Sequence, residues 1–195
     1  MDAPYNIETT EPSMNTISGI LFFCAFFPYV WGVLSGETVP SPVSWAIWAS
    51  VDTLALLAMR KEKAPTGQLT GAVAGAWTVF AVALVFGKPT IGSIELVSII
   101  GALAGILLWK ITDNALTAIV CSQLATFFGS IPTAAGAWDN PLQESLVAWS
   151  MWTLSGVCAL FAIEKWNLAS ALQPLNFTAI DGAVVVLIVL RPLFL

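Results

Sequence analysis

The sequence predicts an all-α membrane protein with seven transmembrane helices, arranged as two parallel three-helix repeats joined by a linker helix. Three observations lead to this prediction. Hydrophobic residues make up 57% of the chain, charged residues make up only 10%, and a segment near the N-terminus recurs 104 residues later without a gap. Soluble domains carry about 25% charged residues, so this composition belongs in a bilayer. The 195 residues are enough for seven spans of about 20 residues with short loops.

The expected helices are apolar runs separated by proline, glycine or charged residues. In order they are 16–35, 43–59, 67–87, 92–110, 114–138, 144–163 and 169–190. The breaks between them are Gly36 to Pro42, Arg60 to Pro65, Gly87 to Pro89, Asp113 with Asn114, and Asp139 to Pro141. Each break ends a helix because proline removes a backbone donor and a charged run does not enter lipid.

The repeat compares residues 18–61 with 122–165 and contains twelve identical positions among forty-four. In both copies a tryptophan pair begins seventeen residues after a proline. A repeated three-helix unit would be inverted in the membrane unless an extra span restored its direction, so the halves are expected to be parallel. The matched residues are Pro28 and Pro132, Trp45 and Trp149, and Trp48 and Trp152.

The chain therefore divides into four parts. An acidic N-terminal tail covers 1–14, the first repeat 15–90, the linker helix 91–112 and the second repeat 113–195. Lysine and arginine are split five to two between the side that carries the N-terminus and the opposite side. The positive-inside rule then predicts a multi-pass protein of the cell membrane with a cytoplasmic N-terminus.

Composition also weighs against several classes of function. The chain has no histidine, no glycine-rich phosphate loop and no nucleophile elbow, so we do not expect an enzyme. No basic stripe indicates nucleic acid, and we expect no cofactor and no metal. The three cysteines lie in apolar runs, which is typical of small packing residues.

The matched prolines and tryptophans have two readings each. Pro28 and Pro132 lie inside predicted helices, where kinks serve either as flexible gates or as simple fits to a packed bundle. Tryptophans at helix starts are typical of the interfacial belt. We therefore expect the first tryptophan of each pair to be a belt residue. Trp48 and Trp152 lie one turn deeper, where they belong either to this belt or to the wall of a solute site.

Two aspartates fall within the predicted spans. From the expected helix starts, Asp52 lies roughly 14 Å from one membrane surface and Asp181 roughly 18 Å from the other. Both depths are near the middle of a core about 30 Å thick. A carboxyl at such a depth is costly and should face the protein interior, either on a solute pathway or as a neutral group hydrogen-bonded to a neighbouring helix.

The pattern of Ser-x-x-x-Trp-x-x-Trp after a late proline, in a three-one-three layout, resembles the PQ-loop/SWEET clan of transporters. The Trp-x-x-Trp elements are also similar to those of PnuC-type vitamin transporters. The clan's Pro-Gln is replaced here by Pro28-Tyr29 and Pro132-Thr133. SWEETs also place the N-terminus outside, opposite to the charge-based prediction for this chain.

This resemblance implies alternating-access transport of a small, mostly uncharged solute, sugar-like or vitamin-like, between two three-helix halves. It also makes Asn176 a candidate pocket residue, because asparagine in the last span is typical of SWEET pockets. The expected partners are the solute and the bilayer, with a homo-oligomer or a larger membrane complex left open. The alternative is a non-transporting membrane protein, either a packing subunit of a complex or a receptor on the same layout.

Overall fold

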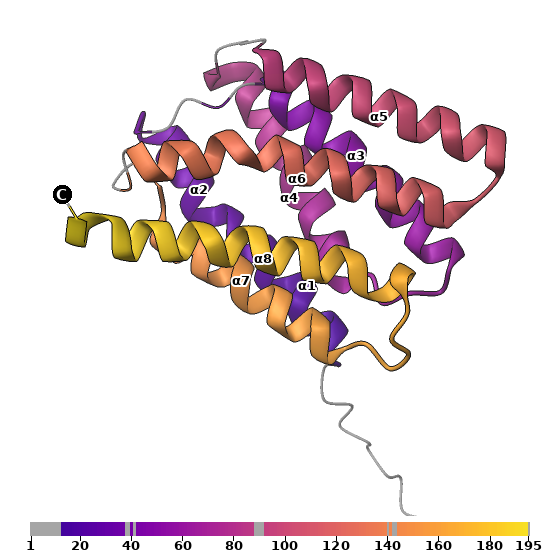
Figure 1. The fold of residues 1–195 in the computed structure, drawn as a ribbon. Helices are drawn as coiled ribbons and strands as arrows, with labels where there is room; N and C mark the ends of the chain where they lie inside the picture. The colour runs from indigo at the N-terminus through magenta and orange to yellow at the C-terminus, as the bar shows by residue number, and fades with distance from the viewer. Residues whose placement is uncertain are drawn as a thin grey trace, which may run out of the picture.

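The computed structural model describes residues 13–37, 40, 42–87, 92–139, 141 and 144–194, and over these ranges it is all-helical (Figure 1). This confirms the predicted all-α class. Most of the predicted acidic tail lies outside the described residues. The helices are α1 (Met14–Cys24), α2 (Phe26–Leu34), α3 (Pro42–Lys61), α4 (Gly67–Phe86), α5 (Ser93–Thr112), α6 (Ala115–Asp139), α7 (Leu146–Phe161) and α8 (Leu168–Leu190), with a closing 3-10 turn, η2 (Arg191–Phe194).

Each predicted helical range ends within two residues of an observed helix end, but the first range is divided into α1 and α2. Pro28 explains the division. It has no N–H to donate to the carbonyl of Cys24, where α1 ends, and its ring crowds that carbonyl. Pro132, its counterpart in the repeat, lies inside α6, which continues to Asp139. The two matched prolines therefore have different effects on their helices.

Polar side chains fix several helix starts. Ser13 accepts a hydrogen bond from the backbone of Thr16 at the start of α1, and Asn167 accepts one from Ser170 at the start of α8. Ser145 caps α7 in the same way. Each cap satisfies a backbone donor that the first helical turn leaves without a partner.

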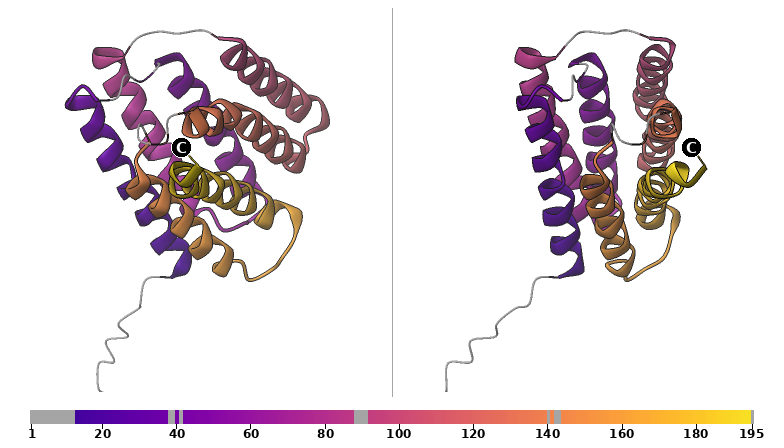
Figure 2. Two further views of the ribbon diagram at one scale, coloured as in Figure 1. Left: turned by 60° about the vertical axis from the view of Figure 1, so that its left-hand side comes forward. Right: turned by 90° about the vertical axis from the view of Figure 1, so that its left-hand side faces the viewer.

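Helices from distant parts of the sequence lie side by side. Figure 2 shows α1 and α4 on one side of the bundle and α5, α6 and α8 on the other. Helix α4 packs against α1 and α3, while α8 packs against α6 and α7. Between these two sets, α1 packs against α7 and α3 packs against α6. Helix α5 packs against α6 and, less extensively, α3, which places it at the edge of the bundle (Figure 1).

Glycine allows α1 and α4 to approach closely. A Cβ at Gly71 of α4 would overlap the backbone of Gly19 in α1. One turn further along α4, a Cβ at Gly75 would overlap the ring of Phe26. The absence of side chains at these positions therefore sets both the spacing of the two helices and the position of an aromatic ring in the interior.

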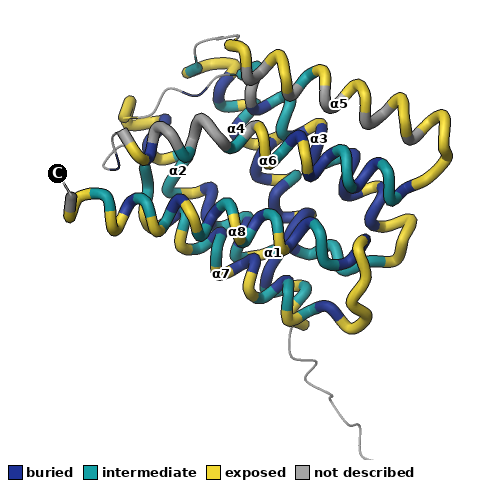
Figure 3. The backbone as a smooth tube through the Cα atoms, viewed as in Figure 1, coloured by how far each residue is buried: buried dark blue, intermediate teal, exposed yellow. Residues whose placement is uncertain are grey.

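The outer surface of the bundle is strongly apolar. Figure 3 shows buried residues on the inward faces of the helices and exposed residues along the outer face of α5. Large apolar side chains are exposed on several helices, with Trp31 at 72% and Phe161 at 76%. Such extensive apolar exposure is not typical of a water-soluble monomer.

Three segments in the described part of the chain are long and apolar enough to cross a membrane. They are Met14–Leu34, Gly67–Phe86 and Leu168–Leu193. Two shorter apolar segments, Ala115–Phe128 and Leu146–Phe161, lie between them in sequence. Length and composition therefore support a helical membrane protein, and the full set of seven spans stays a prediction.

Candidate functional site

A cavity of about 100 Å³ lies in the interior of the bundle, where both helix sets contribute to its wall. The described lining residues come from α1, α2, α3, α4, α6, α7 and α8. Most of the wall is aromatic or small and apolar, with four polar exceptions. The lining residues are Phe22, Phe26, Trp45, Trp48, Asp52, Ala72, Ala76, Thr126, Ser130, Trp149, Trp152, Phe177, Ile180 and Asp181.

The repeated tryptophan pairs meet in this wall with nearly the same geometry. Trp45 and Trp48 have ring centroids 5.3 Å apart at an interplanar angle of 81°. In the second copy, Trp149 and Trp152 have centroids 5.0 Å apart at 80°. Both are edge-to-face contacts, which the charge distribution of aromatic rings favours. The equal sequence spacing in the two copies thus corresponds to an equal local arrangement of rings.

The expectation that Trp45 and Trp149 belong to an interfacial belt is wrong. Trp45 is only 7% exposed and, like Trp149, lines the cavity. Belt tryptophans and cavity-wall tryptophans both occur in the first turn of a helix. Which of the two a tryptophan becomes depends on whether its side of the helix faces lipid or the protein interior. Here that side packs against α2, since the ring of Trp45 also contacts Tyr29 at a centroid distance of 5.2 Å.

Hydrogen bonds hold the second tryptophan pair in place. The buried indole Nε1 of Trp152 donates to the carbonyl oxygen of Phe22 at 3.1 Å. The indole of Trp149 donates to Oε2 of Glu144 at 2.8 Å. Partial burial raises the pKa of the Glu144 carboxyl, and the hydrogen bond from Trp149 lowers it in part. Fixed indoles give this part of the wall a defined shape.

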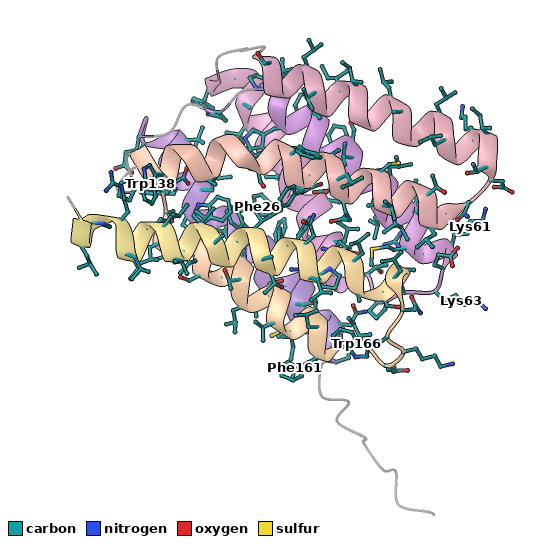
Figure 4. The ribbon with its side chains drawn as sticks, in the orientation of Figure 1. Phe26, Lys61, Lys63, Trp138, Phe161 and Trp166 are labelled. Atoms are coloured by element: carbon teal, nitrogen blue, oxygen red, sulfur yellow. The ribbon has the colours of Figure 1, made fainter. Side chains whose placement is uncertain are left out.

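Asp52 of α3 and Asp181 of α8 enter the same cavity from opposite helix sets. They are 8% and 6% exposed, so both face the interior as the sequence predicts. Oδ2 of Asp181 is buried and has no hydrogen-bond partner among the described residues. Among the described residues, no lysine or arginine lines the cavity. Figure 4 shows the contrast: Lys61 and Lys63 lie at one end of the bundle, far from Phe26 in its interior.

Asn176 lies elsewhere. Its side-chain nitrogen donates to the backbone oxygen and to Oε1 of Gln123, at 3.0 and 2.9 Å, which ties α8 to α6. It is not among the residues that line the cavity, and neither is Pro28. The side chain of Pro132 lies outside the described residues. Of the predicted solute-site residues, the structure thus brings together the two tryptophans and the two aspartates.

A buried polar layer lies one helical turn from the cavity, and sequence reasoning did not single it out. It consists of Ser18, Gln68, Ser155 and Gln173, each at most 2% exposed. Nε2 of Gln173 donates to Oε1 of Gln68 at 3.0 Å, and the Ser155 hydroxyl donates to the Ser18 carbonyl at 2.7 Å. The signal in the sequence was available, because each glutamine is a polar residue near the start of an otherwise apolar predicted helix.

This layer lies at one end of the cavity. Its members precede the lining residues Phe22, Ala72 and Phe177 by four positions on α1, α4 and α8. On α7, which runs in the opposite direction, Ser155 follows Trp152 by three positions. Four positions are about one helical turn. The layer therefore lies between the cavity and the ends at which α1, α4 and α8 begin.

Comparison of the chain with protein-family models, with curated proteins and with solved structures finds no match. The class of protein therefore rests on the described fold and cavity alone. The chain is a helical protein with three membrane-length apolar segments and a buried cavity lined by aromatic rings and two carboxyl groups.

Proposed function

We propose that this protein is a multi-pass membrane transporter, or facilitator, of a small and mostly uncharged solute, sugar-like or vitamin-like, that moves by alternating access between two three-helix halves. The observation that carries the proposal is the cavity, because repeat-related tryptophan pairs line it from two different helix sets. Transporters built from internal repeats bind their solutes near the bilayer midplane at the interface between the repeats.

The proposed halves are α1 to α4 and α6 to α8, with α5 as the linker helix. The pattern of contacts supports this division, since α4 packs against α1 and α3 within the first half, and α8 packs against α6 and α7 within the second. The contacts between the halves are also symmetric, because corresponding helices pair crosswise: α1 packs against α7, and α3 packs against α6. Seven spans and a parallel arrangement of the halves follow from this division together with the repeat.

Alternating access requires that the cavity be closed on at least one side at a time. The polar layer of Ser18, Gln68, Ser155 and Gln173 supplies such a closure, and its hydrogen bonds join the two halves. These bonds would separate when that side opens. The break at Pro28 supports a hinge in the first half, and Pro132 is proposed as its counterpart in the second.

The closed end is proposed to face the cytoplasm, in the cell membrane, with the N-terminus on the same side. Five of the seven lysine and arginine residues support this orientation by the positive-inside rule. Lys61 at the end of α3 pairs with Asp113 just before α6, at 2.9 Å, so these two connections lie at one end of the bundle. Both side chains are largely exposed, so the pair contributes little stability.

A transporter needs a water-accessible pathway through the bundle, whereas a packing subunit does not. We would replace the three native cysteines and introduce Thr126→Cys, which lies in the cavity wall, or Leu124→Cys on the outer surface of the same helix. In reconstituted vesicles, a water-soluble thiol reagent should label position 126 and leave position 124 unlabelled. Equal lack of labelling at both positions, on both sides of the membrane, would refute a transport pathway.

A further inference from the structure

The cavity has an unbalanced set of charges. Two carboxyl groups, on Asp52 and Asp181, enter it at more than nine-tenths burial, and no basic residue in the described part of the chain lines it. Taking a carboxylate out of water without a nearby cation is costly. A carboxyl group in such a place is either protonated or paired with a positive charge, and a cationic solute in the cavity would supply that charge. In the described part of the chain the one ion pair, between Lys61 and Asp113, lies at the surface.

We propose that the cavity binds the ammonium group of a small organic cation, with Asp52 and Asp181 as its charge partners and the indole rings of the tryptophan pairs around it. The rest of such a solute is uncharged, and the proposal rests on the transport function for the movement of that solute across the membrane. Binding itself is a separate claim that stands on the cavity alone.

Asp181 gives the most direct support. Its Oδ2 atom is buried without a hydrogen-bond donor, and among the described residues it belongs to the only cavity-lining side chain with such an atom. A buried acceptor with no donor is rare in folded proteins and calls for an explanation. A quaternary ammonium group in the cavity supplies the positive charge that a carboxylate oxygen in this position attracts.

The aromatic wall fits the same ligand. Perpendicular contacts within the pairs Trp45–Trp48 and Trp149–Trp152 mean that the two rings of each pair present surfaces in different directions. Phe26 adds a further ring at 5.1 Å from Trp152. Cations are attracted to the faces of aromatic rings, most strongly to tryptophan, and cages of such rings recognise quaternary ammonium groups.

The volume of the cavity and the chemistry of its wall limit which cations can bind there. A cavity of about 100 Å³ is smaller than the roughly 150 Å³ that accepts benzene, so it takes a headgroup of a few heavy atoms. A hard metal ion would want six or more oxygen ligands. Besides the two carboxyl groups, the described lining offers only the hydroxyl oxygens of Thr126 and Ser130, and the remaining wall is mostly carbon. A weakly hydrated organic cation suits this wall better.

The test uses the full-length protein in detergent and measures tryptophan fluorescence during titration with choline. The comparison ligand is 3,3-dimethylbutanol, which has the same shape and no charge, with ionic strength held constant by sodium chloride. We expect saturable binding of choline and at least about tenfold weaker binding of the neutral analogue. Equal binding of the two, or no saturable response to choline, would overturn the proposal without any variant.

Variants then assign the charge partners. Asp181→Asn and Asp52→Asn keep the size of the side chain and remove its charge, and each should weaken choline binding about tenfold or more while binding of the neutral analogue changes little. Glu164→Gln, at an exposed position outside the cavity, is the matched control and should leave binding unchanged. If the double aspartate variant binds choline with wild-type affinity, neither aspartate is a charge partner of the cation.

Flux measurements separate this inference from the transport proposal. If vesicles containing the protein bind choline but pass no solute faster than empty vesicles, the binding site stands and the transport function falls. If they pass a neutral solute while choline neither binds nor competes, transport stands and the cation site falls.

Discussion

The indole Nε1 of Trp152 donates a hydrogen bond of 3.1 Å to the backbone carbonyl of Phe22, and so connects α7 with α1 across 130 residues of sequence. The two rings also contact each other, with centroids 5.9 Å apart. One residue of the repeated tryptophan motif therefore both lines the cavity and joins the two helix sets. A change at this position should affect stability as well as solute binding.

Trp152→Phe keeps an aromatic ring and removes the indole donor. The buried carbonyl of Phe22 then loses its partner, which costs about 1–3 kcal/mol. We expect a lower thermal unfolding temperature in detergent, measured by circular dichroism. Trp166→Phe is the control, because Trp166 is 63% exposed and should be replaceable at little cost. Equal unfolding temperatures for the Trp152 variant and the wild type would show that the hydrogen bond is unimportant.

Gly75→Ala should destabilise the fold, because the added Cβ would overlap the ring of Phe26 in the cavity wall. Overpacking of this kind costs about 1–3 kcal/mol. Gly182→Ala is the matched control. Its Cβ would lie 3.6 Å from the Thr153 methyl group, an ordinary contact, and alanine favours a helix over glycine. If both variants unfold at the same temperature, the tight packing of Gly75 against Phe26 is contradicted.

The amide pair of the polar layer should behave as a coupled unit. Gln68→Leu alone leaves the Gln173 amide without its acceptor, and Gln173→Leu alone leaves Gln68 without its donor. Each single variant should lose about 1–3 kcal/mol, while the double variant should recover much of that loss because both polar groups are gone. A double-mutant cycle on unfolding free energies measures the coupling. Strictly additive effects would count against a direct pair.

Glu144 should give the protein a pH-dependent component of stability. Burial raises its pKa above the ordinary value of 4.5, so the folded state holds its proton more tightly than the unfolded state does. Its contribution is therefore most favourable below pH 4.5 and declines as the pH rises through the folded-state pKa. Glu144→Gln keeps an acceptor for Trp149 and removes this titration. The unfolding temperature of the variant relative to wild type should increase from pH 4 upward; a constant difference would contradict the prediction.

The helices were predictable because each apolar run ends at a strong local signal. Proline, glycine or charged residues mark the boundaries, and such signals act within a few residues. The division at Ala25 was not predicted in detail, because a proline can bend a helix or interrupt it, and Pro28 and Pro132 differ in this respect. The choice depends on packing that only the folded bundle supplies.

The cavity was predictable in part, for a related reason. A charge at bilayer depth can only be buried, so Asp52 and Asp181 were placed correctly in the interior. Tryptophan and amide groups have more than one favourable environment. Trp45 therefore looked like a belt residue and Asn176 like a pocket residue, whereas helix rotation places the first in the wall and the second against Gln123. The rotation of a helix about its axis depends on packing against other helices, and a single sequence contains little information about it.

Solute flux through the cavity is the central claim, and reconstituted vesicles test it most directly. A mixed panel of sugars, vitamins and small amines would be offered to vesicles, and their contents would be measured by mass spectrometry. We predict that at least one solute enters faster than into protein-free vesicles, with saturation, and that the Trp48→Ala and Trp152→Ala double variant slows its entry about tenfold or more. Trp166→Ala should transport at the wild-type rate. Entry of every solute at the protein-free rate, or unchanged flux in the double variant, would contradict the proposed pathway.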